Sequence, residues 1–227
     1  MILLLMGAKG SGKGTQGRLL SEHFGVPYLA SGDLLRRAIT QDSALGRQVR
    51  EYVERGLYVP DGLMVPAAMA ALEALRHQSG TPGVVLDGFP RTREQAVAVD
   101  EALAKIGTRI QRVLFLYVPK EVLVARVAGR WTCSNCGATY NEASKPPRVP
   151  GTCDRCGQPL IQRVDDRPEQ VERRLAVDLE QTIPLAAHYH QKGVLVQVDG
   201  NRPPEQVTAD LIAAVGDPDW RCKEGER

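Results

Sequence analysis

Short, uninterrupted apolar runs alternate along this chain with longer segments in which apolar residues recur every three or four positions. An uninterrupted run is typical of a strand buried on both faces, and the wider spacing is typical of a helix with one buried stripe. The runs predict strands at residues 2–6, 28–29, 84–86, 113–118 and 194–198. The stripes predict helices at 16–24, 34–39, 45–53, 63–75, 92–106, 120–128, from 171 onward and at 205–215. Leu19 and Leu20 are expected to face inward in the first helix, and Leu175 and Leu179 in the one after residue 171. Strands alternating with helices indicate the α/β class, with a five-stranded parallel sheet covered on both faces.

Two stretches interrupt this alternation. Residues 31–60 predict a small helical insertion. Residues 129–164 are rich in Gly, Pro, Cys and Asn and have few large apolar side chains, so they cannot build a hydrophobic core alone. We therefore expect a core at 1–30, 61–128 and 165–227 (the last including a C-terminal tail), with insertions at 31–60 and 129–164.

Composition narrows the class of protein. Lysine plus arginine is 29 against 27 aspartate plus glutamate, and the net charge of +2 does not favour a general nucleic-acid or membrane-surface binder. Aromatic residues are 5%, which leaves no surplus of rings for stacking on single strands. The longest apolar run, residues 1–6, is too short to span a bilayer, and no basic segment precedes it. We therefore expect a cytoplasmic protein without nucleic-acid or membrane partners.

A glycine-rich loop at residues 7–15 follows the first predicted strand and precedes a helix, with glycine and lysine at the spacing of a phosphate-binding loop. Glycines let successive backbone N–H groups approach phosphate oxygens closely, and the helix N-terminus adds its dipole. Lys13 adds a mobile positive charge. Here Gly14 follows the lysine, and the hydroxyl comes at Thr15. The loop predicts nucleotide contacts from Gly10, Ser11, Gly12, Lys13, Gly14 and Thr15.

Asp87 ends the predicted strand at 84–86 and begins the sequence Asp-Gly-Phe-Pro-Arg. An acid at the carboxyl end of a parallel strand points into the ligand crevice of such sheets, where it could hold magnesium directly or through water. Taken alone, Asp87 could equally be a helix cap or a loop acid.

Four cysteines form two Cys-x-x-Cys-Gly turns separated by residues 137–152. Two such turns predict a tetrahedral zinc site, and four thiolates leave no open coordination position, which favours a structural role. Disulfides or idle cysteines are the alternatives. The predicted ligands are Cys133, Cys136, Cys153 and Cys156.

The glycine loop, the sequence Ser-Gly-Asp-Leu-Leu-Arg at 31–36, the motif at 87–91, and Asp165-Asp166 before an arginine-bearing helix occur in one order over nearly the whole chain. This ordered set closely resembles adenylate kinase, in its long-lid, zinc-binding bacterial form. The chain departs from the family at Lys9, where proline is usual, and at Ser31, where many relatives have threonine. The resemblance implies a three-layer P-loop fold with a nucleoside-monophosphate-binding insertion and a zinc-ribbon lid. It also implies a monomer that transfers a phosphoryl group between Mg-bound ATP and AMP, giving two ADP.

Residue roles follow from the same resemblance. The acceptor is an anionic phosphate, so the reaction needs charge neutralisation and alignment rather than a general base. The implied catalytic residues are Lys13, Arg91, Arg130, Arg163 and Arg174. The implied AMP-binding residues are Ser31, Arg36, Leu57, Tyr58, Val59, Gly88, Phe89, Pro90, Arg91, Gln95, Arg163 and Arg174. With the glycine loop, ATP is expected at Arg126, Arg130, Thr139, Tyr140 and Arg202, with Asp87 on magnesium through water. Asp165 and Asp166 are expected at the lid hinge.

Two rival functions stay open at this point. A nucleoside-monophosphate kinase could take UMP, CMP or GMP as acceptor, or GTP as donor, although the long lid and Gln95 favour AMP. A zinc-ribbon nucleic-acid binder could use ATP as a switch. The balanced charge argues against that binder, and so does the second phosphate site implied by Arg36 and Arg91.

Overall fold

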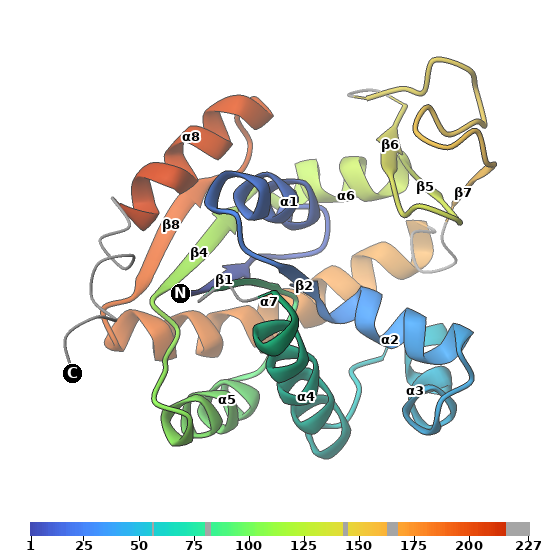
Figure 1. Cartoon of the computed structure of the whole chain (residues 1–227). Helices are drawn as coiled ribbons and strands as arrows, with labels where there is room; N and C mark the ends of the chain where they lie inside the picture. Colours follow the sequence, from blue (N-terminus) through green and yellow to red (C-terminus); the bar gives the residue numbers. More distant parts are fainter. Residues whose placement is uncertain (56, 80–82, 143–144, 163–167, 217–227) are drawn as a thin grey trace.

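The computed structural model describes residues 1–55, 57–79, 83–142, 145–162 and 168–216. Within them, five strands form the main sheet: β1 (Ile2–Met6), β2 (Tyr28–Ala30), β3 (Val84–Asp87), β4 (Arg112–Tyr117) and β8 (Leu195–Asp199). All neighbours are parallel, in the order β2-β3-β1-β4-β8 (Figure 1). Each strand agrees within a residue or two with a predicted one. The predicted fold class, an α/β protein with a five-stranded parallel sheet, is confirmed.

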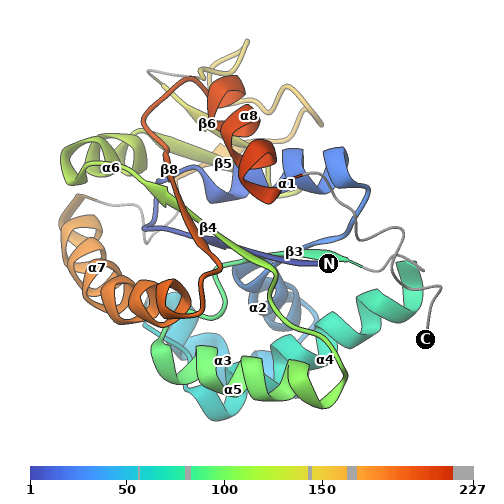
Figure 2. The same ribbon diagram turned by 90° about the vertical axis from the view of Figure 1, so that its left-hand side faces the viewer.

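Helices cover both faces of the sheet, as Figure 2 shows with the sheet seen nearly edge-on. Alternate residues of β1 face opposite ways: Ile2, Leu4 and Met6 join one buried cluster, and Leu3 and Leu5 join the other. The helices are α1 (Lys13–Phe24), α2 (Ser31–Thr40), α3 (Ala44–Glu54), α4 (Asp61–Ser79), α5 (Arg93–Lys105), α6 (Lys120–Ala128), α7 (Pro168–Gln191) and α8 (Pro204–Val215). The first cluster packs against α4, α5 and α7, and the second against α1 and α8. None of the helices in the described ranges combines the length and apolar character needed to cross a bilayer.

The predicted stripes are confirmed with one exception. Leu175 is fully buried and Leu179 packs beside it against α6. In α1, Leu20 is fully buried, but Leu19 is 36% exposed and lines a cavity, so its predicted inward position is wrong. Neighbouring residues of a helix differ by about 100° in direction, so Leu19 and Leu20 cannot both face the sheet.

Two segments extend from the core at one end of the molecule, on the right of Figure 1. The segment 31–60 contains α2 and α3, which pack closely because Gly46 has no side chain: a Cβ there would lie 2.0 Å from the Ala38 carbonyl oxygen. The segment 129–164 contains a small antiparallel sheet with the order β6-β5-β7, built from β5 (Arg130–Cys133), β6 (Thr139–Asn141) and β7 (Leu160–Ile161).

Candidate active site

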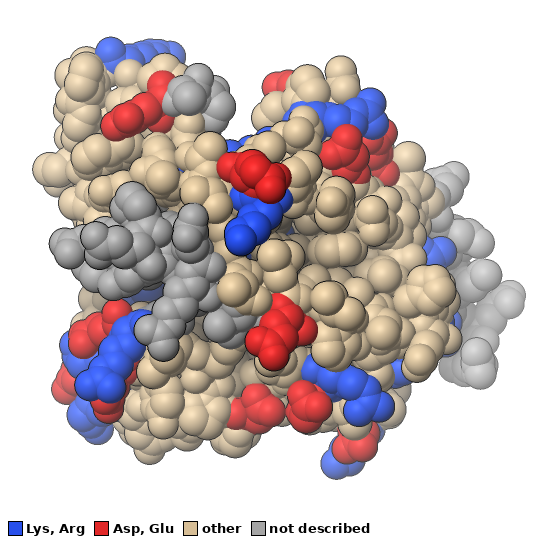
Figure 3. All heavy atoms as spheres, turned by 180° about the vertical axis from the view of Figure 1, so that it is seen from behind, with Lys and Arg blue, Asp and Glu red and all other residues tan. Residues whose placement is uncertain are grey.

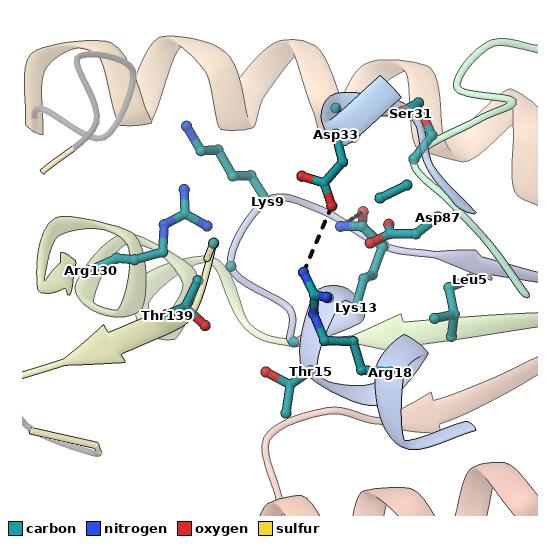
Figure 4. Close-up of a pocket in the computed structure, with 18 of the residues that line it drawn as sticks. Leu5, Lys9, Lys13, Thr15, Arg18, Ser31, Asp33, Asp87, Arg130 and Thr139 are labelled. Atoms are coloured by element: carbon teal, nitrogen blue, oxygen red, sulfur yellow. Dashed lines mark hydrogen bonds and ion pairs between the residues drawn. The ribbon is translucent and has the colours of Figure 1, made fainter. Parts of the chain in front are cut away.

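A cavity of about 650 Å³ opens at the carboxyl-terminal ends of the parallel strands (Figure 4). Ligands of open α/β sheets bind at this edge. The lining side chains come from the glycine loop, the start of α2, the end of β3 and the small sheet, and α7 closes one side. Most predicted site residues line it: Gly10, Gly12, Lys13, Gly14, Thr15, Ser31, Arg36, Tyr58, Asp87, Gly88, Pro90, Arg91, Arg126, Arg130, Thr139 and Tyr140.

The glycine loop has the backbone shape of an anion cradle. Gly12 caps the N-terminus of α1 with φ of 99°, a left-handed conformation that other residues rarely adopt. Gly10 also has positive φ, and a Cβ there would lie 2.7 Å from Val127 Cγ2. The Ser11 hydroxyl is buried and has no hydrogen-bond partner among the described residues. A buried hydroxyl without a partner is costly, but Ser11 does not line the cavity, so the loop's contribution to a ligand site comes from its backbone and from Lys13.

Lys13 lies at the floor of this cradle. Its Nζ donates hydrogen bonds of 2.7 Å to the Gly7 carbonyl oxygen and 2.9 Å to that of Ala8. Burial lowers the pKa of Lys13, and the charges of Asp87 and Asp178 only partly oppose that effect. A cation held with little solvation gains strongly from a polyanion, so this position favours phosphate binding.

Asp87 lies beside Lys13 at the end of β3 (Figure 4). The Tyr28 hydroxyl donates a 2.5 Å hydrogen bond to Asp87 Oδ2. Burial, and next the charge of Asp87, raise the pKa of Tyr28 well above its usual range, so the hydroxyl remains a donor. Arg18 lies over the tyrosine ring, with its guanidinium carbon 5.4 Å from the ring centroid, and pairs with Asp33 at 3.7 Å. Carboxylate oxygens are the ligands that Mg²⁺ prefers, so the donor chemistry of Asp87 fits that ion.

The second end of the cavity carries the residues expected to bind AMP. Ser31 Oγ donates a hydrogen bond of 2.7 Å to the Gly88 carbonyl oxygen, and Arg91 Nε donates another of 2.7 Å to the same atom. The Arg91 guanidinium also lies 5.7 Å from the centroid of the Tyr58 ring, and Arg36 pairs with Asp33. The guanidinium groups of Arg36 and Arg91 therefore face the same cavity as the glycine loop. The two arginines are far from that loop in the sequence, but the fold brings them to the same edge of the sheet.

Among the predicted AMP-binding residues whose side chains the structure describes, four do not line the cavity. Val59 and Phe89 are buried in the core beneath it, and Leu57 is 54% exposed elsewhere. Gln95 is 2% exposed; its amide donates to Asp61 Oδ1 at 2.7 Å and accepts from the Arg91 backbone N–H at 2.9 Å. Contact between Gln95 and a base therefore requires its amide to exchange partners.

The predicted ATP side is formed by α6 and the small sheet. Arg126 donates to the Gly200 carbonyl oxygen at 3.0 Å, while Arg130 and Thr139 point into the cavity (Figure 4). Ser11 and Arg202 are not part of the lining; the Arg202 guanidinium bonds to Gln206 and Asp210 along α8.

Several predicted residues fall outside what the structure describes. Arg163, Asp165 and Asp166 lie outside the described residues, and for Arg174 the helix α7 is described but the side chain is not. Conversely, sequence reasoning gave no role to Asp33, although it lies in the motif at 31–36. It also missed cavity residues that belong to no motif: Arg18, Tyr28, Lys145, Arg155 and Asp178.

The four predicted zinc ligands come together in the small sheet. Their sulfur atoms all lie within 4.8 Å of one another, with 3.4 Å between Cys133 and Cys156 and 3.6 Å between Cys136 and Cys153. A tetrahedral zinc with Zn–S bonds of about 2.3 Å separates its sulfurs by about 3.8 Å, so this cluster fits the ion. A hydrogen bond from Tyr140 lowers the pKa of Cys153 to about 6, which favours the thiolate that metals bind.

Comparison with known proteins decides the family. A model of the family "Adenylate kinase" matches residues 5–194. The chain belongs to the adenylate kinase family. An adenylate kinase of Symbiobacterium thermophilum is 46% identical over 95% of this chain and 98% of its own length. Adenylate kinases of Enterococcus faecalis and Moorella thermoacetica are each 41% identical, over 93% and 97% of this chain and 97% and 100% of their own lengths.

These matches confirm the predicted adenylate kinase function and phosphotransferase class, with Mg as the ion that adenylate kinases use with ATP. Because the matched relatives are aligned over nearly their whole length, the similarity includes the cysteine-bearing segment as well as the glycine loop. The matches thus support the adenylate kinase function over the rival function of a zinc-ribbon protein that uses ATP as a switch.

Proposed function

We propose that this chain performs the family's reaction, ATP + AMP to two ADP, with both nucleotides in the 650 Å³ cavity. The observation that carries the proposal is that one cavity joins a phosphate cradle, at Gly10–Gly14, to a separate arginine-lined end, at Arg36 and Arg91. An enzyme that only hydrolysed or sensed ATP would not need the second set of guanidinium groups.

The chemistry of this cavity follows from charge. The AMP phosphate is already anionic, so no base is needed, and the barrier comes from bringing two polyanions together in line. Lys13, Arg91 and Arg130 supply fixed cations at the reacting phosphates, and Arg163 and Arg174 join them when the lid closes. Asp87 holds Mg²⁺ through water, and when bound the ion neutralises charge on the ATP phosphates. Closure of segments 31–60 and 129–164 over the core excludes water, which would otherwise accept the phosphoryl group.

Substrate identity depends on the two nucleoside ends. We assign the AMP end to Ser31, Tyr58 and the 88–91 loop, with Gln95 reaching the base after its amide exchanges partners. The ATP base lies beside Arg126 and the backbone near Arg202. Thr139 and Tyr140 approach the ATP phosphates from the lid.

Zinc is the metal that we assign to Cys133, Cys136, Cys153 and Cys156. Four sulfur ligands leave no position for substrate, so the ion is structural. The buried cluster around it is small, consisting of the two cysteines at 133 and 153 together with Tyr140 and Leu160. Structural zinc contributes about 10–16 kcal/mol of apparent binding energy, which is enough to order a segment with so little apolar core.

We also propose a cytoplasmic monomer without nucleic-acid or membrane partners. Basic and acidic side chains are interspersed over the face seen in Figure 3, without a broad field of one sign. Nucleic-acid binding relies on a basic patch or stripe.

A coupled assay of ADP formation tests the proposal. ATP is offered with AMP, UMP, CMP or GMP in turn, and the expected result is turnover with AMP well above the other three. Equal rates with all four acceptors would contradict the AMP assignment. ATP hydrolysis at the same rate with and without an acceptor nucleotide would contradict phosphoryl transfer itself.

A further inference from the structure

Gly17 is a glycine in the interior of α1, where glycine lowers helix stability relative to alanine. The residue is buried, and its backbone does not need positive φ. The space around it supplies the reason. A Cβ on Gly17 would lie 2.3 Å from Tyr28 Cε2 and 2.9 Å from both Tyr28 Cδ2 and Leu5 Cδ1. The missing side chain therefore makes room for the tyrosine ring against the helix.

In this position, the Tyr28 ring places its hydroxyl next to Asp87. Strand β2 pairs with β3 so that Tyr28 lies opposite Val85, two residues before Asp87. With the ring lying along α1, the hydroxyl reaches Asp87 Oδ2 at 2.5 Å. It also lies near the start of the helix, because a Cβ on Gly14 would be 3.7 Å from the same hydroxyl oxygen. The hydroxyl that holds the acid at the end of β3 therefore lies beside the first turn of α1, next to the phosphate cradle.

We propose that Tyr28 is a positioning residue, which orients the Asp87 carboxylate for the magnesium–nucleotide complex, and that Gly17 is required to admit its ring. The proposal rests on the role of Asp87 given under the proposed function.

A tyrosine suits this task better than a cation. The phenol is a neutral donor, so it fixes one carboxylate oxygen without cancelling the negative charge that attracts Mg²⁺ and its waters. Oδ1 and the remaining lone pairs of Oδ2 stay available to those waters. The neighbouring Arg18 stacks over the ring and pairs with Asp33, so its charge is directed to a different carboxylate.

Calorimetry with a bisubstrate mimic, two adenosines joined through a polyphosphate, tests the positioning role. Its affinity is measured over a series of Mg²⁺ concentrations for the wild type, Tyr28→Phe, Asp87→Asn and the double variant. We expect Tyr28→Phe to raise the Mg²⁺ concentration of half-maximal effect by about 10-fold, as loss of a partner that orients a metal ligand typically does, with affinity in the absence of metal unchanged. The double variant is expected to lose no more than Asp87→Asn alone.

Tyr117→Phe is the matched control, because it removes a hydroxyl from a tyrosine that is 50% exposed at the end of β4, and it should leave the Mg²⁺ dependence unchanged. A wild-type Mg²⁺ dependence in Tyr28→Phe would overturn the proposal, as would an equal loss with and without metal. Absence of mimic binding by the wild type would instead contradict the proposed function and, with it, the premise of this role.

Melting temperatures test the requirement for glycine. Gly17→Ala is expected to lower the melting temperature in the wild type, where the ring and Leu5 must shift, and to lower it by much less in a Tyr28→Ala background, where only the end of the Leu5 side chain must shift and alanine favours the helix. The single variant should also show the weakened Mg²⁺ dependence of Tyr28→Phe. An equal drop in melting temperature in both backgrounds would show that the glycine does not serve the ring.

Discussion

Replacing Lys13 by methionine should separate activity from stability. Methionine keeps most of the length of the side chain and removes its charge. A single preorganised donor to a transition state is worth about 2.7–4 kcal/mol, and a buried cation belongs at the upper end. At about 1.4 kcal/mol for each factor of ten, Lys13→Met should lower kcat by about 1,000-fold.

The same change should not destabilise the fold. Burial lowers the pKa of Lys13 from its ordinary value of 10.5, so the charged form costs folding free energy at neutral pH. Methionine removes that cost. The carbonyls of Gly7 and Ala8 lose their donor; Gly7 lines the open cavity, from which water can replace the lysine, whereas Ala8 is buried, so the loss is confined to one carbonyl. We expect a melting temperature equal to or above that of the wild type.

The difference in stability between the wild type and Lys13→Met should depend on pH. Because the folded-state pKa is the lower one, the wild type gains stability as the pH rises from the folded pKa toward 10.5, where the unfolded chain also loses its proton. The stability advantage of Lys13→Met should therefore be largest at neutral pH and shrink near pH 10. Lys105→Met, at an exposed residue in the last turn of α5, is the control and should leave both properties nearly unchanged.

Coupled kinetics and thermal melts of these two variants provide the measurements. A kcat within a factor of ten of the wild type would refute the role of Lys13. A melting temperature several degrees lower at every pH would show that the lysine stabilises the fold, against the burial argument.

Three further predictions concern the insertions. Cys133→Ser should reduce the bound zinc from about one ion per chain and lower the melting temperature, while the rate of ADP formation at moderate temperature changes little. Elemental analysis and thermal melts check this, and a wild-type protein without zinc would contradict it. Gly46→Ala should lower the free energy of unfolding by about 1–3 kcal/mol, measured in urea, because its Cβ would meet the Ala38 carbonyl; no change would contradict the close α2–α3 contact. Tyr58→Phe removes a 2.7 Å hydrogen bond to Asp178 and should raise the KM for AMP about 2- to 10-fold while leaving the KM for ATP unchanged. Equal changes in the two KM values would contradict the assignment of Tyr58 to the AMP end.

The parts of the fold that the sequence predicts are those with a local cause. Strand β1 is recognisable because five consecutive apolar residues are buried on both faces of the sheet. The glycine loop and the cysteine turns are recognisable because their chemistry requires fixed spacing along the chain, and the structure brings each set together.

Contacts between distant segments could not be predicted in this way. The bond from Tyr28 to Asp87 depends on the pairing of β2 with β3, and the bond from Tyr58 joins residues 120 positions apart. Gln95 shows the opposite difficulty. Its position follows the family motif, yet its amide is held by Asp61 and by the Arg91 backbone, and only the packed structure reveals those partners.

The most direct test of the central claim, that one cavity holds both nucleotides end to end, is a crystal structure with Mg²⁺ and the bisubstrate mimic. The result expected is one mimic spanning the cavity, with phosphates at Lys13 and the far phosphate at Arg36 and Arg91. A mimic bound at the glycine loop alone, with Arg36 and Arg91 facing solvent, would contradict it.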